Sequence, residues 1–254
     1  MPSLRAVKNP RQAVATEIYT SDSVLIGKFF RENRTPIVYK ELSPLLVKTL
    51  VCTEDIRFYN HHGLDLFSLF SSMLSTAKGD QRGGSTITQQ LAKNLFRTRA
   101  NNHMGLLQYI PLLRTLISKT KEWITAIKLE FFYSKEDILE MYFNTVDFGN
   151  NWYGIKVATD NYFQLQPHDL KIEQCAMLIG MLKATSTYNP RKNPEKAFER
   201  RNVVLSQMAK YDVITQKVCD SVSKIPVILN LKKNSMADQD NSYIRTLVEK
   251  KLEI

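Results

Sequence analysis

The chain has 254 residues, of which 43% are hydrophobic, so it can bury a core of its own, and we expect one main domain with appended segments. Its formal net charge of +10 admits nucleic acid, anionic lipid or a phosphorylated substrate as partner. An odd number of cysteines, three in all, argues against a disulfide framework or a metal site. The sequence also lacks the run of about 18 apolar residues that a transmembrane helix needs.

The predicted elements are mostly helical. Residues 1–15 are basic and expected to be loose, and residues 16–30 read as a β-hairpin. Ser43-Pro44 and Ser134-Lys135-Glu136-Asp137 are typical helix starts. Helices are expected at 44–53, 65–78, 85–96, 119–133, 138–144, 172–182 and 193–210, and the end from residue 226 is expected to be extended and then helical again.

Residues 104–117, MGLLQYIPLLRTLI, form an oily segment that Pro111 interrupts and arginines flank. One interpretation is a core helix kinked by the proline. The other is a segment that dips into the headgroup region of a membrane.

The stretch from Gly83 to Asn94 combines a glycine pair, hydroxyl and amide side chains, and a lysine. Ser85 is a favoured N-cap residue, so a helix is expected to begin there. Glycines before a helix start expose backbone N–H groups, and the helix N-terminus adds partial positive charge. The stretch therefore predicts an anion-binding cradle to which Lys93 adds a full charge. A capped surface helix is the simpler alternative.

No Asp or Glu occurs between Gln81 and Lys121. The same window is rich in cations, namely Arg82, Lys93, Arg97, Arg99, Arg114, Lys119 and Lys121. Such a run is often only a solvated face. Because this one begins at a predicted anion cradle, it favours a phosphate site or a membrane-facing surface.

Two carboxylates are candidates for chemistry. Glu54 ends a predicted apolar helix, where the helix dipole disfavours a negative charge, and this suits a general base. Glu122 lies three residues after Lys119 on a predicted helix, so the two can face the same way. A solvated helix end and an ordinary surface ion pair are the alternatives. Together with the cradle, these acids suggest a reaction at a sugar whose leaving group is a phosphate.

Five motifs in order resemble the family-51 peptidoglycan glycosyltransferases, the lysozyme-like domains of class A penicillin-binding proteins and of monofunctional transglycosylases. The second motif, which contains Gly-Ser-Thr-Ile-Thr-Gln-Gln, is the most specific. The motifs are Glu54-Asp55-x-x-Phe58-x-x-His61-x-Gly63, Gly84 to Asn94, Lys119-x-x-Glu122, Ile138-Leu139-Glu140-x-Tyr142-x-Asn144 and Tyr188-Asn189-Pro190.

The resemblance implies a mainly α, lysozyme-like bilobal helical domain with a small N-terminal β-hairpin segment. Residues 1–40 would be the hairpin segment after a missing membrane anchor, and residues 41–225 the glycosyltransferase domain. Residues 226–254 would begin the linker to a missing transpeptidase domain.

The family's activity would be polymerisation of lipid II into β-1,4 glycan strands, with inversion and release of undecaprenyl pyrophosphate. Glu54 matches the family's general base and Glu122 its second glutamate, beside the donor pyrophosphate. Lys93 and Lys119 match cations that offset the leaving-group charge. The remaining expected substrate-binding residues are Phe58, His61, Arg82, Ser85, Thr86, Gln90 and Asn94.

No cofactor is expected to be required, although a divalent cation, Mg or Mn, assists some family members, and no carboxylate cluster defines a metal site. The implied partners are lipid II, growing lipid-linked glycan, the membrane surface and other cell-wall synthesis proteins, but no nucleic acid. The implied location is the outer, periplasmic face of the cytoplasmic membrane, with the protein held by an N-terminal transmembrane helix absent from this chain.

The match has departures and the function has rivals. Ser118 precedes Lys119 where the family often has arginine, for which Arg114 could substitute, and Asn151 occupies a position where glycine is common. A lysozyme-type glycoside hydrolase would share the fold, but nothing in the sequence marks the protonated acid that hydrolysis needs. A non-enzymatic nucleic-acid module would interleave exposed aromatics with arginines, whereas most aromatics here follow apolar periodicity.

Overall fold

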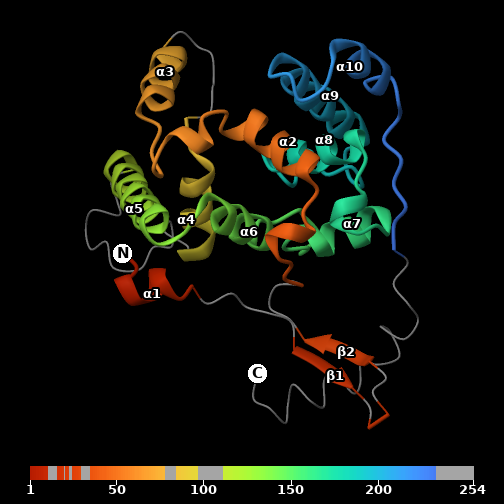
Figure 1. Ribbon diagram of the computed structural model, residues 1–254, viewed down its shortest axis with the longest axis horizontal. Helices are drawn as coiled ribbons and strands as arrows, with labels where there is room; N and C mark the ends of the chain where they lie inside the picture. The colour runs from red at the N-terminus through yellow and green to blue at the C-terminus, as the bar shows by residue number, and fades with distance from the viewer. Residues whose placement is uncertain are drawn as a thin grey trace.

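The computed structural model describes residues 1–10, 16–19, 21–22, 25–29, 35–77, 84–96 and 111–232. The fold is mainly helical, as expected, with one small antiparallel hairpin (Figure 1). The helices and strands are α1 (Leu4–Lys8), β1 (Thr16–Tyr19), β2 (Leu25–Phe29), α2 (Pro44–Glu54), α3 (Leu66–Ala77), α4 (Ile87–Phe96), α5 (Pro111–Phe132), α6 (Lys135–Thr145), α7 (Ile155–Phe163), α8 (Ile172–Met181), α9 (Pro194–Lys210) and α10 (Gln216–Val222). Short 3₁₀ turns are η1 (Tyr39–Glu41), η2 (Phe58–Asn60) and η4 (Pro167–Asp169).

Helix α8 is the centre of one half of the body. Every residue from Cys175 to Met181 is buried, because α2 and α9 pack against it from different sides. A helix that is apolar all round is stable only inside a core. This packing fixes the C-terminal end of α2 beside α8 and α9.

The other half is built on α4, which packs between α5 and α6. Ile87, Leu91 and Ala92 form its buried stripe. Gly63 closes this half from the α2 side: it has a φ of +84°, and a Cβ there would lie 2.8 Å from the backbone of Ala126 in α5. Only glycine fits such a position without strain, so the chain after α2 can approach α5 closely.

Most sequence-predicted helices are confirmed, and so is the hairpin, in which Ile18 pairs with Gly27. The capping box that opens α6 is also confirmed: the Ser134 hydroxyl accepts from the Asp137 amide, and the Asp137 carboxylate accepts from the Ser134 amide. The expectation that residues 1–15 are loose was wrong for α1, whose Val7 is buried against the core.

Within the described residues, Pro111 does not kink a helix. It is the first residue of α5, which then runs unbroken to Phe132. Proline is favoured at that position because its missing N–H would have no partner in the first turn anyway. Residues 104–110 lie outside the described part of the chain, so the proposed dip of this segment into a membrane stays a prediction.

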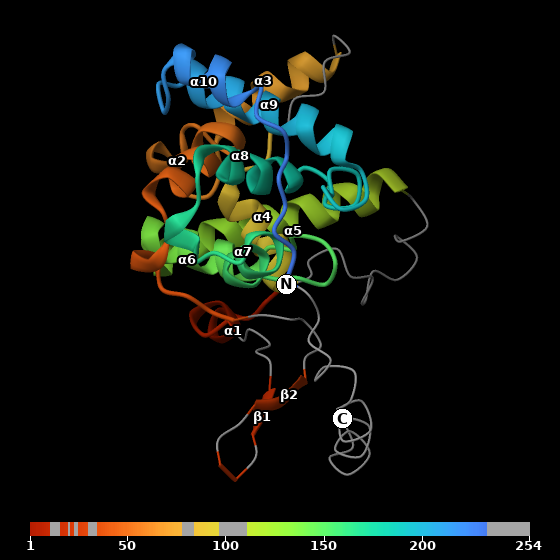
Figure 2. The ribbon, with the colours of Figure 1, turned by 90° about the vertical axis from the view of Figure 1, so that its right-hand side faces the viewer.

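The segment after α10 returns along the body to α7. The amides of Asn230 and Lys232 donate to the carbonyls of Tyr162 and Asn161, and Lys232 pairs with Asp160. The hairpin lies below the helical body (Figure 2). The domain boundaries expected at residues 40 and 225 stay predictions.

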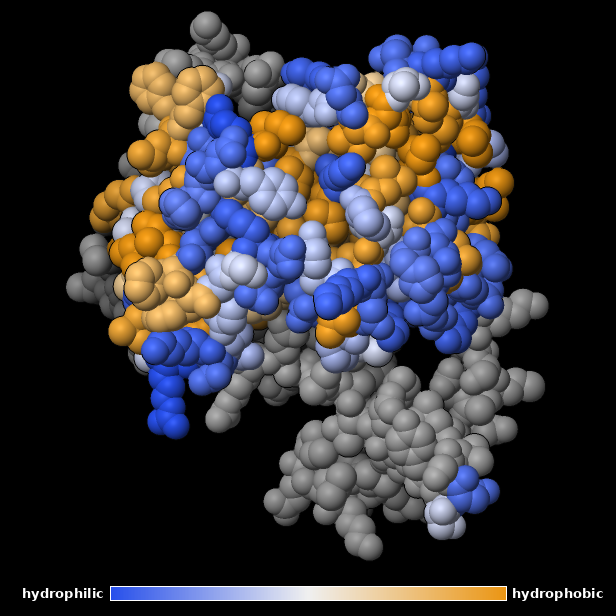
Figure 3. Space-filling view, viewed as in Figure 1, coloured by the Kyte–Doolittle hydropathy of each residue, from blue (hydrophilic) through white to orange (hydrophobic). Residues whose placement is uncertain are grey.

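Large apolar side chains are exposed on two helices at the edge of the molecule. Figure 3 shows hydrophobic residues along the left side, where α3 and the lower end of α5 lie. They include Leu66, Phe67 and Phe70 of α3 and Phe131 of α5. Within the described ranges, no helix combines the length and the apolar character needed to cross a membrane.

Candidate active site

A cleft of about 810 Å³ lies where the two halves of the body meet. Helices α4 and α5 supply one wall, which we call the near wall, and α9 and the residues that follow α8 supply the opposite one, the far wall. The C-terminal end of α2 forms the floor, and α3 borders one side. Polar and charged side chains make up most of the lining.

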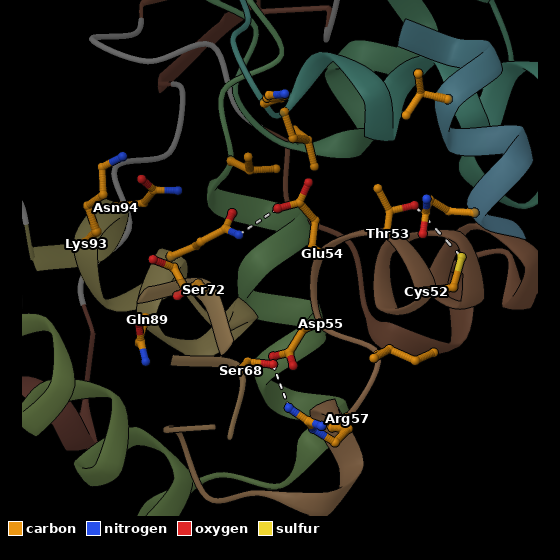
Figure 4. A pocket seen from close by; sticks show the side chains of 18 of the residues that line it. Cys52, Thr53, Glu54, Asp55, Arg57, Ser68, Ser72, Gln89, Lys93 and Asn94 are labelled. Carbon is orange, nitrogen blue, oxygen red and sulfur yellow. Dashed lines mark hydrogen bonds between the residues drawn. The ribbon is translucent and has the colours of Figure 1, made fainter. Parts of the chain in front are cut away.

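Glu54 is the last residue of α2 and extends into this cleft (Figure 4). Gln90 of α4 donates from Nε2 to Glu54 Oε2 at 2.8 Å. Among the described residues, Glu54 Oε1 has no hydrogen-bond partner. One carboxylate oxygen is thus fixed by a neutral donor, while the other faces the cleft and can receive a proton.

Asp55, next to Glu54, is buried, and its carboxylate is bonded to other parts of the chain. Its carboxylate accepts from the Ile87 amide at 3.0 Å and contacts His61 Nε2 at 3.1 Å. The end of α2 is thereby tied to the start of α4. Because these hydrogen bonds restrain Asp55, they also hold the neighbouring Glu54 in place.

The start of α4 differs from the prediction. Thr86, not Ser85, caps the helix, accepting from the Gln89 amide at 3.2 Å. The Ile87 amide is taken by Asp55, so two of the first N–H groups of the helix already have partners. The helix N-terminus is therefore not the anion cradle that the glycine-rich stretch indicated. The polar side chains farther along α4 line the cleft instead.

The near wall carries the predicted cations. Lys119 Nζ donates to Ser85 Oγ at 3.0 Å and pairs with Glu122 Oε2 at 2.9 Å, so the expected alignment on one helix face is confirmed. Glu122 is only 1% exposed. In Figure 4, Lys93 and Asn94 extend from α4 across the cavity from Glu54. This wall is suited to a ligand with several negatively charged oxygens.

The far wall holds three cations that sequence reasoning missed, namely Lys183, Arg200 and Lys210. They come from separate elements, the residues after α8 and two turns of α9, so no local motif joins them. Arg200 and Lys210 lie about 80° apart around α9, so the sequence could have placed only these two on one broad helix face. The cleft is therefore basic on both sides.

Seven of the predicted site residues line the cleft together, namely Glu54, Ser85, Gln90, Lys93, Asn94, Lys119 and Glu122. Phe58, His61 and Thr86 lie behind the cleft wall: Phe58 is fully buried, and Thr86 donates to the Gly63 carbonyl at 2.7 Å. The structure therefore gives these three a supporting position and no direct place in the cleft. Arg82 lies outside the described residues, as does the side chain of Arg114.

Behind the wall, His61 and Phe58 belong to one network with Lys135. The Lys135 ammonium lies 4.3 Å from the centre of the Phe58 ring and donates to the His61 carbonyl and to Glu130. Glu130 also accepts from the Thr88 hydroxyl of α4 at 2.6 Å. This network fixes the turn that carries the His61 side chain toward Asp55.

Two features of the structure concern a cysteine nucleophile and a metal site. Burial raises the pKa of the Cys52 thiol to about 11, so this cysteine stays protonated and is no nucleophile. Within the described ranges, no three His, Cys, Asp or Glu side chains are placed to hold a metal ion. Glu54 and Glu122 of the cleft are bonded to an amide and to an ammonium group, partners that do not fit a divalent cation held between these two carboxylates.

The sequence matches the profile of the Transglycosylase family over residues 22–209. It is 36% identical over 222 residues to penicillin-binding protein 1A of Escherichia coli (strain K12), a match that covers 87% of this chain and 25% of the relative. It is 37% identical over 226 residues to penicillin-binding protein 1F of Bacillus subtilis (strain 168), covering 88% and 30%. The chain thus spans less than a third of the length of these relatives.

A crystal structure of penicillin-binding protein 1A from Haemophilus influenzae is similar in fold, with a TM-score of 0.53 and 21% identity. The similarity covers 94% of this chain and 24% of that one. The helical body that carries this basic cleft is thus that of a transglycosylase domain. The chain belongs to the Transglycosylase family.

Proposed function

We propose that this chain polymerises lipid II into β-1,4-linked glycan strands, with lipid-linked pyrophosphate as the leaving group. The observation that carries the proposal is the joint presence of Glu54 and the cations of both walls in one cleft. The reaction needs a base in contact with the acceptor hydroxyl, close to the donor carbon from which the pyrophosphate departs. The size of the cleft, about 810 Å³, suits sugar and pyrophosphate groups together.

In the proposed reaction, Glu54 removes the proton from the acceptor 4-hydroxyl. The oxygen forms a bond to the anomeric carbon of the donor, and the bond from that carbon to the pyrophosphate oxygen breaks with inversion. The electron pair leaves with the pyrophosphate, and the proton stays on Glu54. A well-placed base contributes about 10²–10⁴-fold to such a step.

Lys93 and Lys119 of the near wall would offset the charge that develops on the donor pyrophosphate. Glu122 would hold Lys119 at the position it needs, through the 2.9 Å ion pair. The donor and the acceptor each carry a pyrophosphate. The pyrophosphate of the acceptor would be held by the far-wall cations Lys183, Arg200 and Lys210. Cations on both walls support the binding of two pyrophosphate groups in this cleft.

Hydrolysis by a lysozyme-type mechanism is less well supported. It needs a carboxylic acid that protonates the leaving oxygen. Glu122, the second carboxylate of the proposed mechanism, is engaged by Lys119 and is not offered as a proton donor. A pyrophosphate leaving group needs cations in place of such an acid, and the cleft has them.

The setting of the reaction follows from the substrate. Because lipid II is membrane-bound, we propose that the chain works at the outer face of the cytoplasmic membrane, with growing glycan and other cell-wall synthesis proteins as partners. A membrane anchor outside this chain would hold it there. A divalent cation is proposed as a stimulant at most.

The test is Glu54→Gln assayed with lipid II. Gln keeps the size of the side chain and its ability to accept from Gln90, but it cannot take a proton. We expect glycan synthesis to fall at least about 10²-fold while the thermal midpoint stays unchanged. Near-normal polymerisation by this variant would contradict the mechanism, and cleavage of finished glycan by the unmodified chain would favour the hydrolase.

A further inference from the structure

A buried tyrosine lies directly behind the Gln90–Glu54 pair. Tyr142 of α6 is 1% exposed, and its hydroxyl donates to Gln90 Oε1 at 2.9 Å. Gln90 in turn donates from Nε2 to Glu54 at 2.8 Å. Three helices, α6, α4 and α2, thus contribute one side chain each to a continuous chain of hydrogen bonds that ends on the proposed base.

The direction of this chain follows from its ends. An ionised carboxylate can only accept, so the Gln90 amide must present its NH₂ group to Glu54. The amide oxygen then faces Tyr142, where a hydroxyl can donate. If the amide were rotated by 180°, its oxygen would face the Glu54 carboxylate and its NH₂ group would face the hydroxyl. The carboxylate end therefore selects one orientation of the amide, and the Tyr142 hydroxyl stabilises that orientation by donating to the amide oxygen.

Tyr142 is a reliable donor. Burial, and then the charge of Glu54, raise the pKa of its phenol well above the ordinary value. The hydroxyl therefore keeps its proton at neutral pH. A side chain enclosed in the core also has little freedom to turn away.

We propose that Tyr142 is a positioning residue for the base: it fixes the Gln90 amide, which in turn holds one oxygen of Glu54 and leaves the other aimed at the acceptor hydroxyl. This role rests on the proposed function of Glu54. Tyr142 does not touch substrate, since it is absent from the cleft lining. It acts only through Gln90.

The chain offers a matched control. Tyr162 of α7 is also fully buried, and its hydroxyl donates to the Phe148 carbonyl at 2.9 Å. It has no contact with Glu54 or Gln90. Tyr142→Phe and Tyr162→Phe each remove one buried hydroxyl and keep the ring. Because the Tyr162 hydroxyl also accepts from Asn150 at 3.0 Å, Tyr162→Phe is expected to lower the thermal midpoint at least as much as Tyr142→Phe.

The first test compares the kinetics of these two variants with lipid II. For Tyr142→Phe we expect kcat to fall roughly tenfold with KM unchanged, because the base is misplaced while the binding side chains are not. Tyr162→Phe should keep the kcat of the unmodified chain. Equal kcat values for the two variants would overturn the proposal.

The second test needs no turnover and so separates this proposal from the proposed function. In ¹⁵N-labelled full chain, the Gln90 side-chain amide signals are identified by their loss in Gln90→Leu. Tyr142→Phe is expected to shift them and to speed their exchange with solvent, and Tyr162→Phe is not. If Tyr142→Phe left the Gln90 signals unmoved, the proposed role of the hydrogen bonds from Tyr142 through Gln90 to Glu54 would be overturned. Failure of the unmodified chain to make glycan would count against the proposed function alone.

A double variant covers the case in which Tyr142→Phe folds poorly. Gln90→Leu breaks the chain of hydrogen bonds at its middle residue. Adding Tyr142→Phe to it should therefore cause no further loss of activity per folded molecule. Additive losses from the two substitutions would overturn the proposal.

Discussion

The two walls of the cleft are both basic, but they are built in different ways. On the near wall, Lys119 is bonded to Ser85 and to the buried Glu122, and the wall follows from two sequence motifs. On the far wall, Lys183 is exposed, and within the described residues Arg200 donates only to a backbone carbonyl, that of Gly180, at 3.4 Å. A fixed cation suits a charge that develops during reaction, and a looser one suits the binding of a charge already present. The predictions that follow test this difference.

The largest effect is expected on the near wall. Lys119→Ala removes the ammonium that we place at the leaving group, so kcat should fall about 10²-fold with a much smaller change in KM. Steady-state kinetics with lipid II measure both constants. Lys128→Ala, on the same helix but outside the cleft lining, is the control. Equal losses in kcat and in substrate binding would contradict the distinction between the walls.

A smaller and different effect is expected on the far wall. Lys183→Ala should raise the lipid II concentration needed for half-maximal rate about tenfold and leave kcat nearly unchanged, because binding is lost without loss of transition-state stabilisation. Lys196→Ala on the exposed face of α9 is the control. A drop in kcat with unchanged KM would place the leaving group on this wall instead.

The smallest effect concerns Arg57, a cleft cation already neutralised by Asp65 at 2.8 Å. Burial alone would raise the pKa of Asp65, but hydrogen bonds from Arg57 and Ser68 hold it at about 2. A carboxyl whose pKa is lowered by folding stabilises the protein at pH values above its pKa in the unfolded chain, about 3.9. This contribution fades as the pH falls toward 2. About 1 kcal/mol should be lost by pH 3.

Thermal midpoints between pH 5 and pH 2.5 measure this loss. Asp65→Asn should flatten the acid side of the curve, whereas Asp169→Asn, at an exposed pair with His168, should not. An unchanged slope in Asp65→Asn would mean that the Arg57 pair adds nothing to stability and that Arg57 is available to a ligand.

The near wall was predictable because its residues are close together in sequence. Gln90, Lys93 and Asn94 lie on one helix with Ser85 just before it, and Lys119 precedes Glu122 by one turn, so proximity in sequence sufficed to group them. The far wall was not predictable, because Lys183 and Arg200 come together only when α9 packs on α8. The role of Tyr142 was equally hidden: its position within α6 marks it as buried, and only the tertiary fold brings its hydroxyl to Gln90.

Errors within the predicted elements also have local causes. Ser85 and Thr86 are both good N-cap residues. Thr86 caps the helix because the buried Asp55 carboxylate accepts a hydrogen bond from the next amide, that of Ile87. That partner lies 32 residues earlier in the chain. Likewise, Pro111 suits either a kink or a helix start, and the residues before it carry no signal that decides between them.

The cysteines of this chain have a practical consequence for spectroscopy. All three, Cys52, Cys175 and Cys219, are buried, and burial raises the pKa of each thiol above its ordinary value. Thiol-directed dyes react with the thiolate, so they should pass over the native sulfurs in the folded protein. A single cysteine introduced at Phe70 on the outer face of α3, a residue that is 66% exposed, can then carry one fluorophore without any prior substitution. The emission of that fluorophore would report on the edge of the cleft while glycan is being made.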